Sequence, residues 1–69
     1  MKAEIGDKIR IISMKGEKNY GGKEGVVECI DGIGQLHGTW GGLAVIPDED
    51  EYEVIEKGWI TSFFYIFPN

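Results

Sequence analysis

Eleven glycines interrupt this 69-residue sequence and leave only short apolar runs between them. The runs alternate apolar with polar side chains, a period of two that is typical of half-buried strands. No segment carries apolar residues at helical spacing between capping residues. The sequence therefore predicts one all-β domain without a substantial helix.

Five short strands are predicted, and the clearest is the first, where Ile9 and Ile11 alternate with Lys8 and Arg10. The five strands are expected at residues 8–12, 25–30, 35–40, 43–46 and 52–55. A polar loop over residues 15–23 separates the first two strands, and an Asp-Gly turn joins the next two. Five short strands with one long loop after the first are typical of a small SH3-like barrel, whose closure removes most free strand edges.

Several side chains in the middle of the sequence are expected to face the core of this barrel. Val27 and Cys29 share one face of the second strand, so Cys29 is interpreted as a small buried apolar residue. Leu36 and Trp40 share one face of the third strand. A second interpretation places Trp40 with Tyr20 in an aromatic binding surface, but the alternation with Leu36 favours the core.

The composition excludes several classes of site. One cysteine and one histidine can form neither an internal disulfide nor a Cys/His metal site, so we expect no metal, no cofactor and a reducing compartment. The sequence opens without an apolar signal-peptide core. Its longest apolar stretch, residues 59–67, is about half the length that a membrane-spanning helix needs. We therefore expect a cytoplasmic protein that contacts no membrane.

The formal net charge of −5 hides an asymmetry along the chain. Residues 1–23 hold six basic and three acidic residues, whereas residues 24–69 hold one basic and nine acidic residues. A basic patch on an acidic protein is one interpretation, and a solvated surface of uneven charge is the favoured one. The acidic run at residues 48–51 lacks the spaced ligands of a calcium loop and is interpreted as a solvated turn.

Two segments carry a family resemblance. The run from Gly6 to Ile11, followed by the run from Gly22 to Val27, resembles the KOW type of SH3-like domain. The longer run from Gly6 to Ile55 resembles a family of short proteins from phages and conjugative elements of Gram-positive bacteria, which is catalogued as a domain of unknown function. This resemblance implies an SH3-like barrel and a mobile-element origin, and it implies no activity.

Four motifs carry the longer resemblance, and two features depart from it. The motifs are Ile11-Ile12-Ser13-Met14, Gly22-x-x-Gly25-x-Val27, Asp31-x-x-Gly34-Gln35-Leu36-His37, and Trp40 with the glycine turn and the run from Leu43 to Pro47. Gly38 stands where the family usually has a β-branched residue, which would thin the core or mark a bulge. The segment from Gly58 to Asn69 extends past the usual end.

The sequence favours a binding module over an enzyme. His37 has no serine or cysteine partner at a recognisable spacing, so nucleophilic catalysis has no support and no catalytic residue is assigned. We expect a contact with an unidentified protein; the alternative is a KOW-like nucleic-acid-binding module that uses the basic N-terminal segment. The candidate binding residues are Arg10, Lys15, Lys18, Tyr20, Lys23 and His37.

The aromatic stretch from Trp59 to Phe67 is strand-prone and carries no charged side chain. We divide the chain into a barrel at residues 1–57 and an apolar extension at residues 58–69. Three interpretations of the extension stay open: it packs on its own barrel, it covers an edge in a second copy, or it awaits a partner as an added strand. The expected state is a monomer or a weak homodimer through this extension.

Overall fold

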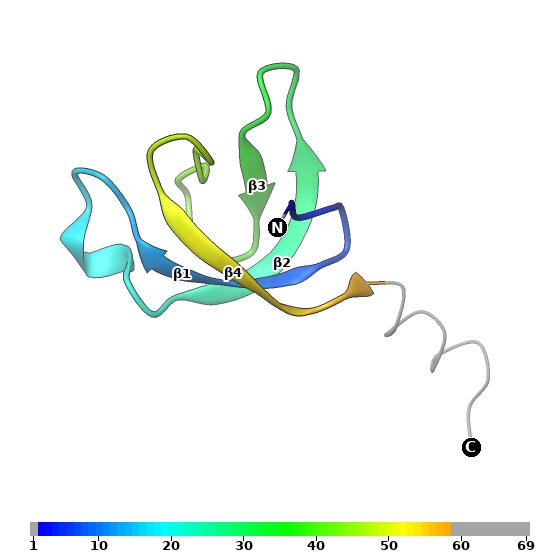
Figure 1. Ribbon diagram of the computed structural model, residues 1–69, viewed down its shortest axis with the longest axis horizontal. Coiled ribbons are helices and arrows are strands. Elements are labelled where there is room, and N and C mark those ends of the chain that lie inside the picture. The colour runs from blue at the N-terminus through cyan, green and yellow to red at the C-terminus, as the bar shows by residue number, and fades with distance from the viewer. Residues whose placement is uncertain (1, 59–69) are drawn as a thin grey trace.

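The computed structural model describes residues 2–58, and strands dominate this part of the chain (Figure 1). Its elements are β1 (Lys8–Ser13), the 3-10 helix η1 (Lys18–Tyr20), β2 (Glu24–Ile30), β3 (Leu36–Gly38) and β4 (Glu51–Glu56). The strands form one antiparallel sheet in the order β3-β2-β1-β4. The prediction of an all-β domain is confirmed for these residues, whereas the predicted extension, apart from Gly58, lies outside them.

The prediction of five strands is wrong, because the described residues contain four. The segment at residues 43–46 makes one isolated bridge instead of a strand: Val45 and Leu36 exchange two backbone hydrogen bonds, each of 2.8 Å. Gly41, with a φ of +146°, precedes this segment, and Pro47, which has no N–H to donate, follows it. The pairing of this segment is limited to that one bridge.

The sheet is also not closed into the predicted barrel. β3 forms one edge and has only three residues, and β4 forms the other edge and pairs with β1 alone. Because β3 and the bridge at Val45 are too short to carry a ladder round to β4, the sheet stays open. The N-terminal segment lies against the open side, where the backbone N–H of Ala3 donates to the Tyr52 hydroxyl at 3.4 Å.

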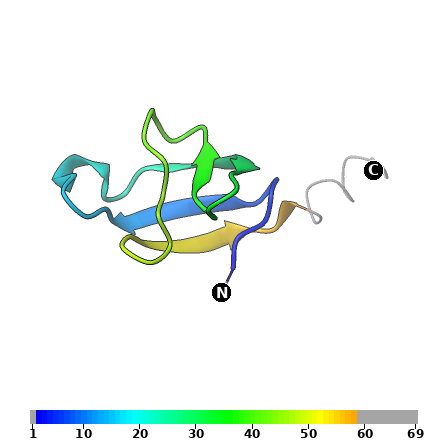
Figure 2. The same cartoon turned by 90° about the horizontal axis from the view of Figure 1, so that it is seen from above.

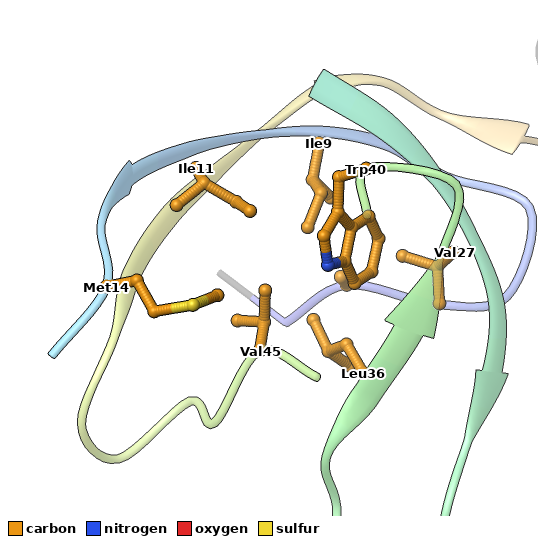
Figure 3. Close-up of a cluster of buried hydrophobic side chains, with 8 residues drawn as sticks. Ile9, Ile11, Met14, Val27, Leu36, Trp40 and Val45 are labelled. Atoms are coloured by element: carbon orange, nitrogen blue, oxygen red, sulfur yellow. The ribbon is translucent and has the colours of Figure 1, made fainter. Parts of the chain in front are cut away.

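The core lies on the inner face of the sheet. Figure 3 shows Ile9 and Ile11 of β1 facing Leu36, Trp40 and Val45. Trp40 is only 4% exposed, and its Nε1–H donates to the Leu43 carbonyl at 2.7 Å, so the interpretation of Trp40 as a core residue is confirmed. Trp40 and Val45 come from the long connection between β3 and β4, which Figure 2 shows reaching across the sheet.

Gly38 marks a bulge, as one of the two interpretations of this residue expected. It lies opposite Val27, and the register between β2 and β3 shifts between Val27 and Cys29. The Val26 carbonyl oxygen and the Trp40 ring occupy the space that a Cβ at Gly38 would need. Only a glycine lets the indole lie this close to the β3 backbone.

The prediction that Cys29 faces the core is wrong, because its side chain is exposed. The register shift after Val27 breaks the alternation from which the inward direction was predicted.

Because Cys29 is exposed, we expect the native protein to react with the thiol reagent DTNB at a rate comparable with that of the urea-unfolded chain. The absorbance of the thionitrobenzoate ion that DTNB releases measures both rates. A reaction that proceeds only as fast as the domain unfolds would contradict the exposed position.

Candidate functional site

The loop between β1 and β2 is held back against β1 by backbone hydrogen bonds. At its start the Glu17 N–H donates to the Met14 carbonyl at 3.0 Å, across a turn in which Gly16 has a φ of +80°. At its end the Gly22 N–H donates to the Ile11 carbonyl at 2.7 Å. Met14 is buried and anchors the first turn in the core. The loop is therefore a fixed platform, although its sequence is polar and rich in glycine.

Tyr20, at the end of η1, is the aromatic centre of this platform. Its ring is half-buried against the core, and its hydroxyl lies 2.8 Å from where a Cβ on Gly41 would stand. The Lys23 Nζ lies 5.4 Å from the centre of the ring, within the range of a cation–π interaction. The structure thus brings together two of the predicted contact residues, Tyr20 and Lys23.

The segment that leads into β4 forms a second wall beside this loop. The Asp50 carboxylate accepts the Lys15 N–H at 2.9 Å and the Ile46 N–H at 2.8 Å, and Asp50 is only 7% exposed. The interpretation of residues 48–51 as a solvated turn is therefore wrong for Asp50, which clips the two loops together. The Lys15 Nζ also lies 3.7 Å from a Glu49 carboxylate oxygen.

A shallow groove of about 220 Å³ lies between the two walls. Its lining is apolar at Met14, Leu43, Ala44 and Ile46 and charged at Lys15, Glu17, Glu49 and Asp50. Leu43 is 40% exposed beside it. We call residues 14–23 and 41–50 together the loop surface, and it combines an apolar floor with a rim of both charges.

Folding neutralises much of the basic N-terminal segment. Arg10 lies between two strands and donates to Glu24 on β2 at 2.9 Å and to Glu53 on β4 at 2.7 Å. The pKa of Arg10 is raised above its usual value, first by the hydrogen bond to Glu24 and then by the Glu24 charge. Lys8 also lies 3.7 Å from Glu24. Within residues 2–58, Lys18 and Lys23 form no ion pair.

His37 lies at the other end of β2 from the loop at residues 14–23. Its Nε2 is 2.8 Å from Asp31, whose other oxygen accepts the N–H groups of Ile33 at 3.1 Å and Gln35 at 2.9 Å. The hydrogen bond with His37 is the largest cause of the lowered pKa of Asp31. His37 and Asp31 thus hold the hairpin between β2 and β3. Of the six predicted contact residues, the structure places four on one loop and sets Arg10 and His37 apart.

Asp7 is a structural residue that the sequence interpretation missed. It is 1% exposed, and its carboxylate accepts the N–H of Glu4 at 2.8 Å, the N–H of Gly58 at 2.9 Å and the Lys57 ammonium at 2.8 Å. Lys57 and Gly58 lie 50 and 51 residues further along the chain, so no local pattern could show them. We call this arrangement the Asp7 clamp, and it fixes where the chain leaves β4.

No group of three or more His, Cys, Asp or Glu side chains in residues 2–58 could hold a metal ion. Within those residues no helix is long and apolar enough to cross a membrane. Every fully buried side-chain nitrogen or oxygen described has a hydrogen-bond partner.

Comparison with known proteins identifies a family. No curated protein and no solved structure matches the sequence. A family model described as Domain of unknown function (DUF4314) matches residues 2–55, which include β1, β2, β3 and all of β4 except its last residue. The predicted resemblance to a family of unknown function is thereby confirmed, while its KOW-type and mobile-element parts stay predictions. The chain belongs to the DUF4314 family of domains of unknown function.

Proposed function

We propose that this chain is a non-enzymatic protein-binding module whose loop surface contacts a protein partner. The observation that carries the proposal is the composition of that surface, an apolar groove with an exposed Leu43 and a rim of both charges. Protein interfaces combine an apolar centre with a polar rim in this way. The fixed backbone of both walls favours binding, because little conformational entropy is lost on contact.

The electrostatics favour a protein over a nucleic acid. Non-specific nucleic-acid affinity comes mainly from lysine and arginine side chains that neutralise phosphates. In this chain the net charge is −5, and Lys8, Arg10 and Lys15 already lie within ion-pair distance of carboxylates. A phosphate backbone would have to displace those carboxylates or approach an acidic surface.

The same surface indicates the chemistry of the partner. An apolar side chain would fill the groove beside Leu43 and Ala44. The charged residues that line the groove are three acids, Glu17, Glu49 and Asp50, and Lys15, which already lies 3.7 Å from Glu49. We therefore propose a partner segment that presents an apolar residue next to a basic one.

Substitution of Leu43 tests the protein-binding proposal. We expect Leu43→Asp to weaken capture of the partner from a lysate of the native host by about tenfold or more, because it places a charge in the apolar centre of the contact. Quantitative mass spectrometry of the captured proteins measures the effect. Ile33→Asp is the matched control, since Ile33 is exposed on the β2–β3 hairpin, outside the loop surface. Equal capture by the two variants, or recovery of nucleic acid alone, would overturn the proposal.

The second candidate function is a KOW-like nucleic-acid-binding module on the same loop. It is supported by the two lysines without ion pairs and by Tyr20, whose ring could stack on a base. Fluorescence anisotropy with mixed oligonucleotides at low salt tests it. Binding that Lys18→Gln with Lys23→Gln abolishes would support this candidate, and no binding at tens of micromolar would exclude it.

The fold relationship and the origin belong to the same proposal. The last strand lies beside the first, and the bridge at Val45 continues the opposite edge, which supports an SH3-like arrangement with an incomplete fifth strand. The resemblance to phage and conjugative-element proteins supports a mobile-element origin. Cytoplasmic localisation is supported by the single exposed thiol of Cys29. Phage or conjugation genes beside the gene for this chain would support the origin.

A further inference from the structure

An apolar cavity of about 320 Å³ lies on the open side of the sheet. It is bounded by the N-terminal segment, the β2–β3 hairpin and the start of β4, and we call it the open-side cavity. Most of its accessible lining is apolar, and it is contributed by Ala3, Ile30, Leu36, Pro47 and Tyr52, with Lys2, Glu4 and Gly34 completing the wall. Pro47 belongs to the loop surface and also lines this cavity, but no residue lines both the cavity and the groove of the loop surface.

The open-side cavity touches the core directly. Ala3 and Leu36 are each 2% exposed, while Ile30 and Tyr52 are partly buried hydrophobic residues packed against that core. A domain of this size has little apolar burial to spare, and water in such a cavity finds few polar partners. One aromatic side chain placed there would bury about 150–250 Å² of its own surface. The cavity therefore favours an apolar occupant.

The Asp7 clamp sets the end of β4 close to this cavity. The carboxylate of Asp7 accepts the N–H of Gly58 on one oxygen and the N–H of Glu4 on the other. Glu4 lines the cavity, and its carboxylate lies 3.5 Å from the Lys57 ammonium. The chain after Gly58 thus starts next to the cavity wall.

Residues 59–69 have the composition that this cavity requires. They carry no charged side chain, and seven of the eleven are aromatic or aliphatic: Trp59, Ile60, Phe63, Phe64, Tyr65, Ile66 and Phe67. Fully extended, eleven residues span about 36 Å. That length is ample for a segment whose first residue follows the clamp.

We propose that apolar side chains of residues 59–69 occupy the open-side cavity of the same chain and complete the core on the side where the sheet does not close. The short tether from Gly58 favours this occupant over a second copy, because it gives an effective concentration in the millimolar range. A second copy of the chain, or a partner, is the competing occupant. The proposal is independent of the protein-binding function, because that function uses the groove lined by Leu43 and Ala44, and no residue of the groove lines the cavity.

Acrylamide quenching of Trp59 in the full chain tests this proposal. The signal of Trp59 is the difference between the native chain and Trp59→Phe, since the other tryptophan, Trp40, is buried in both. We expect Trp59 to be protected at low micromolar concentration. Ile30→Glu should raise its quenching constant several-fold, because it places a charge in the cavity wall. Ile33→Glu is the matched control, three residues away and outside the cavity lining, and should leave the constant unchanged.

Pro47→Glu provides a second disrupting variant, because Pro47 lines the cavity and is itself exposed, so its replacement spares the core. It should also expose Trp59 while the circular dichroism spectrum stays native. Three results would overturn the proposal: full quenching of Trp59 in the native chain, protection that Pro47→Glu does not reduce, or protection that appears only at concentrations where sedimentation shows a dimer. The last result would assign the cavity to a second copy.

Discussion

Replacement of Gly38 by alanine is expected to remove most of the unfolding free energy of the domain at 25 °C. The added Cβ would overlap the Val26 carbonyl oxygen on one side and the Trp40 ring on the other. Overpacking of a core usually costs about 1–3 kcal/mol and occasionally more. Here one obstacle is backbone and the other is an indole that is 4% exposed, so neither can move away freely. A domain of this size rarely has more than about 3–5 kcal/mol of unfolding free energy, so the substitution removes most of it.

Urea denaturation followed by circular dichroism measures this loss. Gly42→Ala is the matched control, because nothing lies within 4 Å of a Cβ built on Gly42 and its φ is not positive. We expect Gly42→Ala to leave the unfolding free energy nearly unchanged. A Gly38→Ala protein within about 1 kcal/mol of the native chain would show that the bulge at Gly38 tolerates a side chain.

Asp7→Ala is expected to lower the unfolding free energy by about 2–4 kcal/mol. The substitution removes the acceptor for the N–H groups of Glu4 and Gly58 and leaves the Lys57 ammonium without its closest partner. The substitution therefore removes the hydrogen bonds that hold Glu4 and Gly58, near the two ends of the described chain. Asp48→Ala is the matched control, since Asp48 is exposed in the segment that leads into β4. Equal thermal midpoints for the two variants would contradict a stabilising role for the clamp.

The Asp7 clamp also gives the stability a defined dependence on pH. Burial raises the pKa of Asp7, but the hydrogen bonds from Gly58, Lys57 and Glu4 outweigh it and hold the pKa below the usual 3.8. A lowered pKa in the folded state means that the carboxylate stabilises fully above the unfolded value and loses its contribution as the pH falls through the folded value. The stability difference between the native chain and Asp7→Asn should therefore be constant from about pH 5 to 8 and shrink below about pH 4. A difference that stays constant down to the acid transition would contradict this assignment.

The parts of the fold that follow from local pattern could be predicted from the sequence. Ile9 and Ile11 alternate within one strand, and β1 lies where that alternation predicts it. Trp40 likewise lies in the core. The segment at residues 43–46 has strand-like composition, but a strand also needs a partner, and β3 offers only Leu36. Cys29 shows the same limit, because a bulge opposite Gly38 changes the direction of side chains that period two predicts.

Part of the candidate site could also be predicted from the sequence, and the rest depends on contacts between distant residues. The loop that carries Lys15, Lys18, Tyr20 and Lys23 could be located from its glycines and charges. The pairing of Arg10 with Glu24 and Glu53 could not, since it depends on which strands become neighbours. Nothing in the local sequence distinguishes Asp50 and Asp7 from exposed surface acids. Their role depends on backbone N–H groups that the fold brings to their carboxylates. The donors, Lys15 for Asp50 and Gly58 for Asp7, are 35 and 51 residues away in the sequence, so a local pattern cannot predict these hydrogen bonds.

The open sheet also leaves the outer edge of β4 without a neighbouring strand in the described part of the chain. An unpaired edge is a template for the same edge of another molecule. β4 carries Glu51, Glu53 and Glu56 along its six residues. Two such edges brought together would set like charges against each other. The glutamates of β4 therefore oppose edge-to-edge aggregation of a sheet that does not close.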